Sequence, residues 1–549
     1  MKNCYATTEC NANVYQNTGV ITVENVQAFA KKQIIGIKGY QRLLLDFSGY
    51  WSAIASDVPN LTIFADPAVV LETENVIRVV EADTSWIEET EGTKADPYLI
   101  KDAADLYGFA KLANAGNTFA GKTVQLAADI QVNVGTVAEW KLDAPVNIWT
   151  PIGNSAANAF AGTFDGQGHT IEGMYYDSGE TGGYIGLFVY TAQTSVIKNL
   201  QVKNTYFTYS GTKDKARIGG IVAYGKGMID TVFCEATLES FALGTGGLVG
   251  CKDGTLTIQN SWFAGTMNLK PCTAYSNQSW AGGFIGFSAG GETNLKNCLF
   301  AGTINTTGIA GQAPRIGGFV GSAHGSGTVN ISSCLSEGTI TTDGATANIA
   351  SVIGCKVNGV ANIRNTYAIS NLYEGNSLGN DTVEFSGVVW KNDILGKEGY
   401  IRTTLEFDDL ETKENFDGVW VARNGKTPAL RSFVPKSEVI NLFEEDTTVV
   451  ADRSWYDNAV TDGNGNAPGS AKNPYVLSDA ADLLGFSQIS QTYNFSGKYI
   501  KLDRNIMFNT SDSSTWDTTA PKNSWTPATP YAYRFAGVFD GNGYTISGL

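Results

Sequence analysis

The stretch that decides the fold is residues 282–306, which read GGFIGFSAGGETNLKNCLFAGTINT. It begins with two glycines and two apolar residues, continues into an apolar run at Leu295–Phe300, and ends with Ala-Gly-Thr-Ile at 301–304. Short apolar runs separated by glycine-rich turns are typical of β-strands, so this stretch predicts three short strands.

The same pattern recurs through the middle of the chain. Gly-Gly-apolar-apolar segments begin at residues 182, 219, 246, 282 and 317, so neighbouring copies lie 37, 27, 36 and 35 residues apart. Ala350–Gly354 is a degenerate last copy. Repeats of this length predict a solenoid whose coils bury apolar residues against one another, and uneven spacing suits loop insertions better than the equal blades of a propeller. We therefore predict an all-β protein, a parallel β-helix repeated in tandem, right-handed because that is the common hand.

The paired glycines, such as Gly247 and Gly283, have two interpretations. They can form corners between sheets, where a positive φ or a close backbone approach excludes a side chain. They can also cradle phosphate, but such a loop needs a helix N-terminus directly after it. No copy is followed by a helical pattern, so we favour the corner interpretation.

A longer repeat sets the domain organisation. Residues 95–109 match 472–486 and residues 160–171 match 535–546, with shifts of 377 and 375. Upstream, Lys2–Ala6 corresponds to Arg364–Ala368, and Phe47 to Phe416. We expect an excerpt of a longer tandem array with four parts: the terminal coil, closing region and linker of a preceding unit (1–94), a complete β-helix with an N-terminal cap helix (95–370), a closing region and linker (371–450), and the incomplete start of a further β-helix (451–549).

Each β-helix is predicted to begin with a short capping helix. Leu106, Phe109, Ala110 and Ala113 have helical spacing, which predicts a helix over Asp102–Ala113. In the second copy Ser478 is the expected N-cap. The helix should cover apolar sheet edges that would otherwise pair with other chains.

Composition narrows the classes of function. The 38 Lys and Arg against 54 Asp and Glu give a net charge of −16, which disfavours nucleic acid and anionic membranes as partners. The chain contains no run of 18 apolar residues, so the sequence does not predict a membrane-spanning helix. Two histidines and eight cysteines without a CxxC pair give no zinc site of the usual kinds, and we expect no cofactor.

Three motifs occur in a fixed order: Pro97–Phe109, Phe160–Ile171, and the glycine coils. In this order they resemble bacterial surface proteins that carry the GLUG motif, over residues 95–370 and 470–549. The resemblance implies an exported adhesin, fibre or cell-wall-associated protein with a right-handed β-helix. Some such proteins also carry a zinc peptidase domain that cleaves immunoglobulin A, but this chain has no HExxH motif, so that activity is not implied here.

Asp165 and Asp540 are the candidate catalytic residues, since β-helix lyases and hydrolases use carboxylates to act on polysaccharides. Glycoside hydrolysis needs a second carboxyl about 5–9.5 Å away and a raised pKa. The glycines after Asp165 favour instead a turn in which the carboxylate accepts backbone N–H groups. Tyr544 replaces His169 in the second copy, so the histidine is not a fixed requirement. We predict no catalytic, cofactor-binding or metal-binding residues.

Other residues have a packing interpretation beside a functional one. Cys298 and Cys334 fall at equivalent positions of adjacent coils, where thiols fill a solenoid interior and a disulfide is geometrically conceivable. Cys251 and Cys355 are a similar pair. Core packing is favoured over a sugar-stacking platform for the aromatic residues Tyr175, Tyr176, Tyr184, Tyr190, Tyr206 and Phe207. A solvated surface is favoured over calcium binding for the acidic residues Asp46, Asp408, Asp409, Glu444, Glu445 and Asp446.

Two functions remain. The first is a non-catalytic structural segment of a repetitive bacterial cell-surface protein, a fibre stalk or adhesin. It would be extracellular, on the cell surface or in a secreted filament, with host or surface glycans or neighbouring copies of the chain as partners. The alternative is a carbohydrate-binding or carbohydrate-active β-helix of the lyase, hydrolase or tail-spike kind. Repetition favours the first function, because an enzyme needs one groove whereas a stalk gains length from copies.

Overall fold

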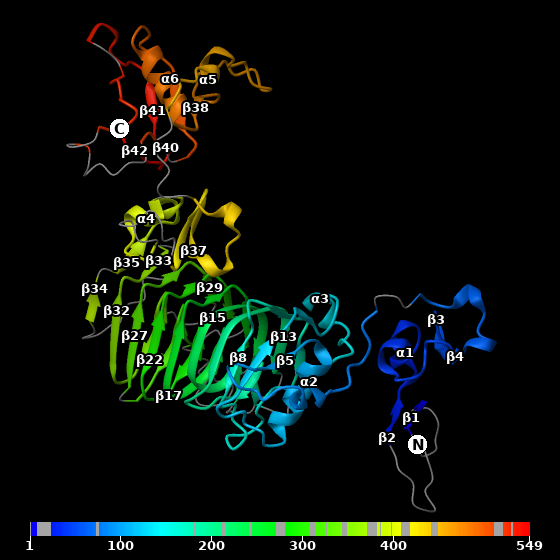
Figure 1. The fold of residues 1–549 in the computed structure, drawn as a ribbon. Helices are drawn as coiled ribbons and strands as arrows, with labels where there is room; N and C mark the ends of the chain where they lie inside the picture. The colour runs from blue at the N-terminus through cyan, green and yellow to red at the C-terminus, as the bar shows by residue number, and fades with distance from the viewer. Residues whose placement is uncertain are drawn as a thin grey trace, which may run out of the picture.

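The computed structural model describes residues 2–7, 24–72, 76–179, 183–209, 216–240, 244–270, 280–306, 314–325, 327–342, 348–369, 382–384, 386–396, 398–407, 418–440, 448–504, 506–509, 516, 520–528 and 531–549. Most of them belong to one long stack of strands, cyan to green in Figure 1. Small modules lie next to the stack, and a short group of parallel strands, β38 to β42 (residues 475–547), follows in the C-terminal part of the chain.

The central stack is a parallel β-helix, which confirms the predicted fold class. Among the described residues, a wide sheet of 25 strands runs along it beside a narrow sheet of six, and the strands in both pair in parallel. The right hand of the coil stays a prediction. The strands of the wide sheet are β5 (Tyr98–Ile100), β6 (Thr123–Leu126), β7 (Ile130–Gln131), β8 (Thr163–Asp165), β9 (Thr170–Glu172), β10 (Tyr175–Asp177), β12 (Phe188–Tyr190), β13 (Val196–Tyr209), β15 (Val222–Ser240), β17 (Val249–Gln259), β18 (Trp262–Phe263), β19 (Thr266–Leu269), β21 (Ile285–Ser288), β22 (Thr293–Lys296), β23 (Leu299–Phe300), β24 (Thr303–Thr306), β26 (Val320–Ala323), β27 (Thr328–Ser332), β28 (Leu335–Ser336), β29 (Thr339–Thr342), β31 (Ile353–Lys356), β32 (Val360–Arg364), β33 (Tyr367–Ile369), β34 (Thr382–Glu384) and β35 (Gly387–Val389).

A coil contains more strand segments than the three predicted. The narrow sheet contributes one segment to each of six successive coils, and the wide sheet contributes the other segments. The coil that begins at Trp280 runs through five strands, β20 to β24. One bend lies at a glycine pair, Gly282-Gly283, and another at Asn297. The strands of the narrow sheet are β11 (Tyr184–Ile185), β14 (Arg217–Gly219), β16 (Gly244–Gly246), β20 (Trp280–Gly282), β25 (Arg315–Gly317) and β30 (Ile349–Ala350).

The interior is a set of aliphatic stacks that run from coil to coil. In one stack each side chain lies in register with the next, and all are buried. Burying a side chain of this size contributes about 1.5–3 kcal/mol, so each coil is stabilised chiefly by its neighbours. The members of this stack are Ile197, Ile229, Ile258, Leu295, Ile331 and Ile363.

The paired glycines lie at corners because of close packing, and the alternative of a positive φ is wrong for them. Neither Gly247 nor Gly283 has a φ in the left-handed region. A Cβ on Gly247 would lie 2.1 Å from the carbonyl oxygen of Gly283, and one on Gly283 would lie 2.2 Å from that of Gly318. The backbone of the next coil thus occupies the space that a side chain would need.

A second corner is made by residues that do have a positive φ. Asn199, Asn260, Asn297 and Asn365 have φ values of 48–52°, and in-register positions in other coils are Thr231 and Ser333. Asparagine tolerates this left-handed conformation better than other residues with side chains. The sequence shows the signal in Lys-Asn-Leu, Gln-Asn-Ser, Lys-Asn-Cys and Arg-Asn-Thr at equal places in the repeat.

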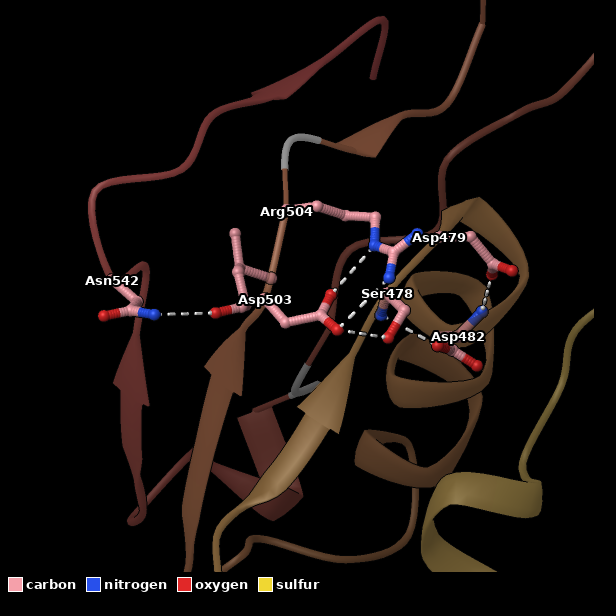
Figure 2. A network of polar contacts seen from close by, with 7 residues as sticks. Ser478, Asp479, Asp482, Asp503, Arg504 and Asn542 are labelled. Carbon is pink, nitrogen blue, oxygen red and sulfur yellow. Dashed lines mark hydrogen bonds and ion pairs between the residues drawn. The ribbon is translucent and has the colours of Figure 1, made fainter. Parts of the chain in front are cut away.

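The capping helices are α2 (Ala103–Asn114) and α6 (Ala480–Ser490). The predicted apolar face of α2 is confirmed, since its four residues are fully buried. The prediction of Ser478 as an N-cap is wrong, because the carboxylate of Asp479 accepts the Asp482 N–H at 2.9 Å. Ser478 lies one residue earlier, where its N–H donates to Asp482 and its hydroxyl to Asp503 (Figure 2).

Two small modules have the same fold. The N-terminal module (residues 24–72) and the closing module (residues 386–440) each contain a short helix followed by an antiparallel hairpin. Phe47 and Phe407 share a backbone hydrogen bond to the residue two positions earlier, so Phe407 is the structural counterpart, and Phe416 lies outside the described residues. The remaining elements are β1 (Lys2–Thr7), β2 (Glu24–Phe29), α1 (Ile37–Arg42), β3 (Trp51–Ile54), β4 (Asp57–Leu61), α3 (Val137–Trp140), α4 (Glu398–Arg402), β36 (Trp420–Arg423), β37 (Lys426–Leu430), α5 (Ser454–Asp457), β38 (Tyr475–Leu477), β39 (Tyr499–Leu502), β40 (Ile506–Met507), β41 (Val538–Asp540) and β42 (Ile546–Ser547).

Candidate functional site

Asp165 lies at the end of β8 and is covered by the next coil. Its carboxylate accepts hydrogen bonds from the Gln167 N–H (3.1 Å) and the Asn199 side-chain amide (3.0 Å), and Lys198 Nζ lies 3.1 Å away. Burial opposes the charge, but these contacts outweigh burial and lower the pKa of Asp165 below its ordinary value. A general acid needs a raised pKa, so this geometry suits a carboxylate that closes a turn.

The other two residues considered with Asp165, His169 and Asp540, also lie at turns. His169 Nδ1 is 3.1 Å from Asp129 Oδ1, which also accepts the Thr170 N–H at 2.9 Å. The exposed carboxylate of Asp540 accepts the Asn542 N–H at 2.8 Å. Among the residues that the structure describes, no three His, Cys, Asp or Glu side chains are arranged to hold a metal ion.

The aromatic residues separate into three groups. Phe207 lies in the main core, as predicted, and Tyr176 packs against it from the edge. Tyr175 and Tyr206 form a small cluster with Trp140. The core prediction is wrong for Tyr184 and Tyr190, which are half-buried outside the core clusters. Their ring centroids are 5.4 Å apart, and that of Tyr190 is 5.7 Å from the ring of Tyr224.

The cysteines of adjacent coils are buried free thiols. Cys334 Sγ accepts the Cys298 N–H at 3.3 Å, and neither thiol forms a disulfide in this structure. Burial raises the pKa of the Cys298 thiol, and it raises the pKa of Cys251 to about 11. Thiols that are protonated and inaccessible are poor nucleophiles, so these residues act as packing groups.

The acidic residues considered as calcium ligands do not gather in the described part of the chain. The Asp46 carboxylate accepts the N–H and hydroxyl of Ser48. The others, Asp408, Asp409, Glu444, Glu445 and Asp446, lie outside the described residues.

The feature that both copies share is the junction where a linker meets a capping helix. The Asp83 N–H donates to the Ala104 carbonyl at 3.0 Å, and Trp86 Nε1 donates to the Asp83 carbonyl at 2.9 Å. A Cβ on Gly108 would lie 1.6 Å from that same Asp83 oxygen. The linker backbone therefore packs directly against the helix at Gly108, where a side chain would not fit.

A buried pair of asparagines fixes the linker to the first coils. Asn147 donates to the carbonyls of Arg78 (3.0 Å) and Val132 (2.9 Å), and its Oδ1 accepts the Val80 N–H at 2.8 Å. Asn133 in turn exchanges two hydrogen bonds with the backbone of Asn147, at 3.0 and 2.8 Å. Both side chains are buried, so the loss of either would leave polar groups of the linker and coil unpaired.

The second copy repeats several contacts of this junction. Asp452 N–H donates to Ala481 at 2.9 Å, and Trp455 Nε1 donates to Asp452 at 3.0 Å. Asn523 accepts the Val449 N–H at 2.8 Å, and Asn509 accepts the Asn523 N–H at 2.9 Å. The sequence analysis missed this site, although both asparagines recur at one shift of 376 between the matched blocks.

The first junction is also where the N-terminal module meets the β-helix. Lys38 forms an ion pair with Asp143, and Arg78 donates to the carbonyls of Leu43 (2.8 Å) and Leu45 (3.0 Å). A cleft of about 780 Å³ lies between the module, the linker and the first coil, and its lining includes Arg42. These contacts hold the N-terminal module, the linker and the first coil against one another.

Within the described ranges, no helix is both long enough and apolar enough to cross a bilayer.

The fold is that of a parallel β-helix protein in which the junction between linker, capping helix and first coil occurs twice. No family model matches the chain. The chain is 34% identical over 157 residues to a "Putative Gly-rich membrane protein" of Evansella cellulosilytica, which covers 29% of this chain and 16% of the relative. It is 29% identical over 170 residues to "Halomucin" of Haloquadratum walsbyi, which covers 31% of this chain and 2% of the relative. The chain thus spans less than a fifth of either relative. A solved structure titled as a putative immunoglobulin A1 protease from Bacteroides ovatus aligns over 63% of this chain and 95% of its own, with 17% identity and a TM-score of 0.45.

Proposed function

We propose that the chain is a non-catalytic structural segment of a repetitive, extracellular cell-surface protein, a fibre stalk or adhesin of the GLUG-motif kind. The observation that carries this proposal is the duplicated junction, because a buried joint between linker, capping helix and coil has value where units must follow one another in a fixed orientation. The names of the two relatives, a glycine-rich membrane protein and a halomucin, are consistent with a place at the cell surface.

Stiffness of the junction is the property to test. We expect small-angle X-ray scattering of the full chain to show one extended shape, and the double variant Asn147→Ala, Asn523→Ala to show a broader range of shapes. The reason is that Asn147 pairs with three backbone groups at the first linker and Asn523 with at least two at the second, and these groups lose their partners. The exposed Lys94→Ala is the control, and scattering curves that coincide for all three proteins would contradict the proposal.

We also propose that the chain has no hydrolase or lyase activity, because Asp165 has a lowered pKa and is held by Lys198 and Asn199. Incubation with plant, algal and bacterial polysaccharides should release neither reducing ends nor unsaturated products. Release that disappears in Asp165→Asn, with the fold intact, would overturn this part.

A carbohydrate-binding role is the second candidate, and it rests on the half-buried cluster of Tyr184, Tyr190 and Tyr224. Aromatic rings at a surface can stack on sugar rings, and the Tyr224 hydroxyl donates to Asp253 at 3.3 Å. Glycan-array binding that is lost in Tyr190→Ala would favour this role, whereas Tyr107→Phe, at the first junction, should leave such binding unchanged.

A further inference from the structure

The N-terminal module and the closing module are attached to their strands in the same way. The Tyr5 hydroxyl accepts the Leu44 N–H at 3.1 Å, and the Tyr367 hydroxyl accepts the Thr404 N–H at 3.0 Å. β1 pairs in parallel with β2 as β33 pairs with β35. β1 and the N-terminal module are therefore a second copy of β33 and the closing module.

The closing module covers the outer face of the preceding coils. Trp420 and Leu430 lie in one buried cluster with Leu299, Leu335 and Tyr367. A ring from the module also reaches two coils further, since the centroid of Phe433 lies 5.7 Å from that of Phe233 and 6.4 Å from that of Trp262.

Polar contacts fix the position of the closing module on this face. The Thr427 hydroxyl donates to Glu337 at 2.6 Å, and Lys296 Nζ lies 2.9 Å from Glu406. The module therefore recognises a stack of coils by apolar ladders flanked by charges.

The corresponding face of the N-terminal module is uncovered. Leu61 is 38% exposed where its counterpart Leu430 is 1% exposed, and Phe64, the counterpart of Phe433, is 70% exposed. Trp51 is half-buried where Trp420 is fully buried. Within the described residues β1 pairs with the single strand β2, whereas β33 lies between β28 and β35.

We propose that the face formed by Trp51, Leu61 and Phe64 docks onto the outer face of β-helix coils of the same repeat type, with the last of those coils pairing in parallel with β1. The partner carries apolar side chains where this chain has Trp262, Leu299 and Leu335. It also carries a basic residue opposite Asp46. Asp46 is the counterpart of Glu406, because the backbone carbonyl of each accepts the backbone N–H of the module's tryptophan at 3.0 Å.

The partner coils must lack a closing module of their own. In a second copy of this chain the matching face is already covered by residues 418–440, so a second copy does not satisfy the requirement. The inference rests on the proposed function in one respect: it assumes that the partner coils belong to a repetitive protein. A failure of docking would leave the linker junction, tested separately above, unaffected.

The test supplies coils without a closing module to the full chain. A duplicate of residues 76–363 is fused directly before Lys2, and hydroxyl-radical footprinting compares Leu61 and Phe64 with and without the addition. A second fusion adds residues 219–363 alone. We expect oxidation of both residues to fall several-fold and the amides of β1 to exchange more slowly. Leu335→Asp in the added copy is the matched control and should restore oxidation.

Two results would overturn the proposal. One is equal oxidation of Leu61 and Phe64 with and without the added coils in both fusions. The other is protection of these residues in the unfused chain that grows with protein concentration, which would identify a second copy as the occupant.

Discussion

The two capped segments, residues 95–172 and the described part of 472–547, share their local structure and differ in burial. Phe164 and Asp165 at the end of β8 are buried, whereas the matching Phe539 is half-buried and Asp540 is exposed at the end of β41. In the first segment the next coil covers β8, because β13 pairs with it. In the second segment β41 pairs with β39 alone within the described chain. Local sequence therefore builds the turns and caps, and the next coil supplies the burial.

The largest expected effect tests whether burial follows the next coil. Phe164→Ala should cost about 3–5 kcal/mol, because Phe164 is fully buried and its ring stacks on Phe109 at 5.6 Å. Phe539→Ala should cost about 1–2 kcal/mol, since its side chain is only partly buried. Hydrogen exchange of the flanking strands measures both. Equal losses would mean that the two segments are buried alike.

The junction should respond equally in both copies, because it does not depend on later coils. Gly108→Ala and Gly485→Ala place a Cβ 1.6 and 2.0 Å from a linker carbonyl, so each should cost about 1–3 kcal/mol. In an ordinary helix the same change is stabilising. Proteolysis at residues 79–86 and 448–455 measures release of the linkers.

Gly463→Ala is the control for this pair, since nothing lies within 4 Å of a Cβ built there. A stabilising effect at Gly108 or Gly485 would show that the linker does not press on the helix.

A smaller difference is expected between the two aspartates. Asp165→Asn should cost about 1–2 kcal/mol, because it breaks the contact with Lys198 in a buried setting. Asp540→Asn should change stability by less than about 0.5 kcal/mol, as is usual for exposed positions. Urea unfolding of the two variants beside the parent chain decides this, and a larger loss at Asp540 would reverse the comparison.

The smallest effect concerns acid stability. The folded-state pKa of Asp165 is lowered, so its stabilising contribution is complete above the unfolded value of 3.8 and is lost as pH falls through the folded value. Below pH 4 the parent chain should therefore lose stability more steeply than Asp165→Asn. Thermal unfolding between pH 5 and pH 2.5 measures the slopes, and parallel slopes would show that Asp165 gains no net stabilisation from Lys198.

The features that could be predicted from the sequence are those set by neighbouring residues in the chain or by the repeat. Glycine spacing gave the parallel β-helix, and the apolar residues of 102–113 gave the capping helix. The sequence did not predict the asparagine junction, because Asn147 acts on Arg78 and Val80, more than 60 residues earlier. The recurrence of the asparagines at a shift of 376 marks these residues but does not identify their partners. The pairing of Phe47 with Phe416 failed for a related reason, since the chain lengths between Gly39 and Gly49, and between Gly399 and Gly418, differ.

The left-handed asparagines have a consequence for the length of the molecule. Each coil carries its own corner residue, so the geometry of a coil does not depend on how many coils precede it. Neighbouring strands lie about 4.7–4.9 Å apart, so the addition or deletion of one whole repeat would change the length of a unit by that step. Unequal recombination between repeats can therefore adjust the reach of the protein in equal increments while both ends of the unit keep their interfaces.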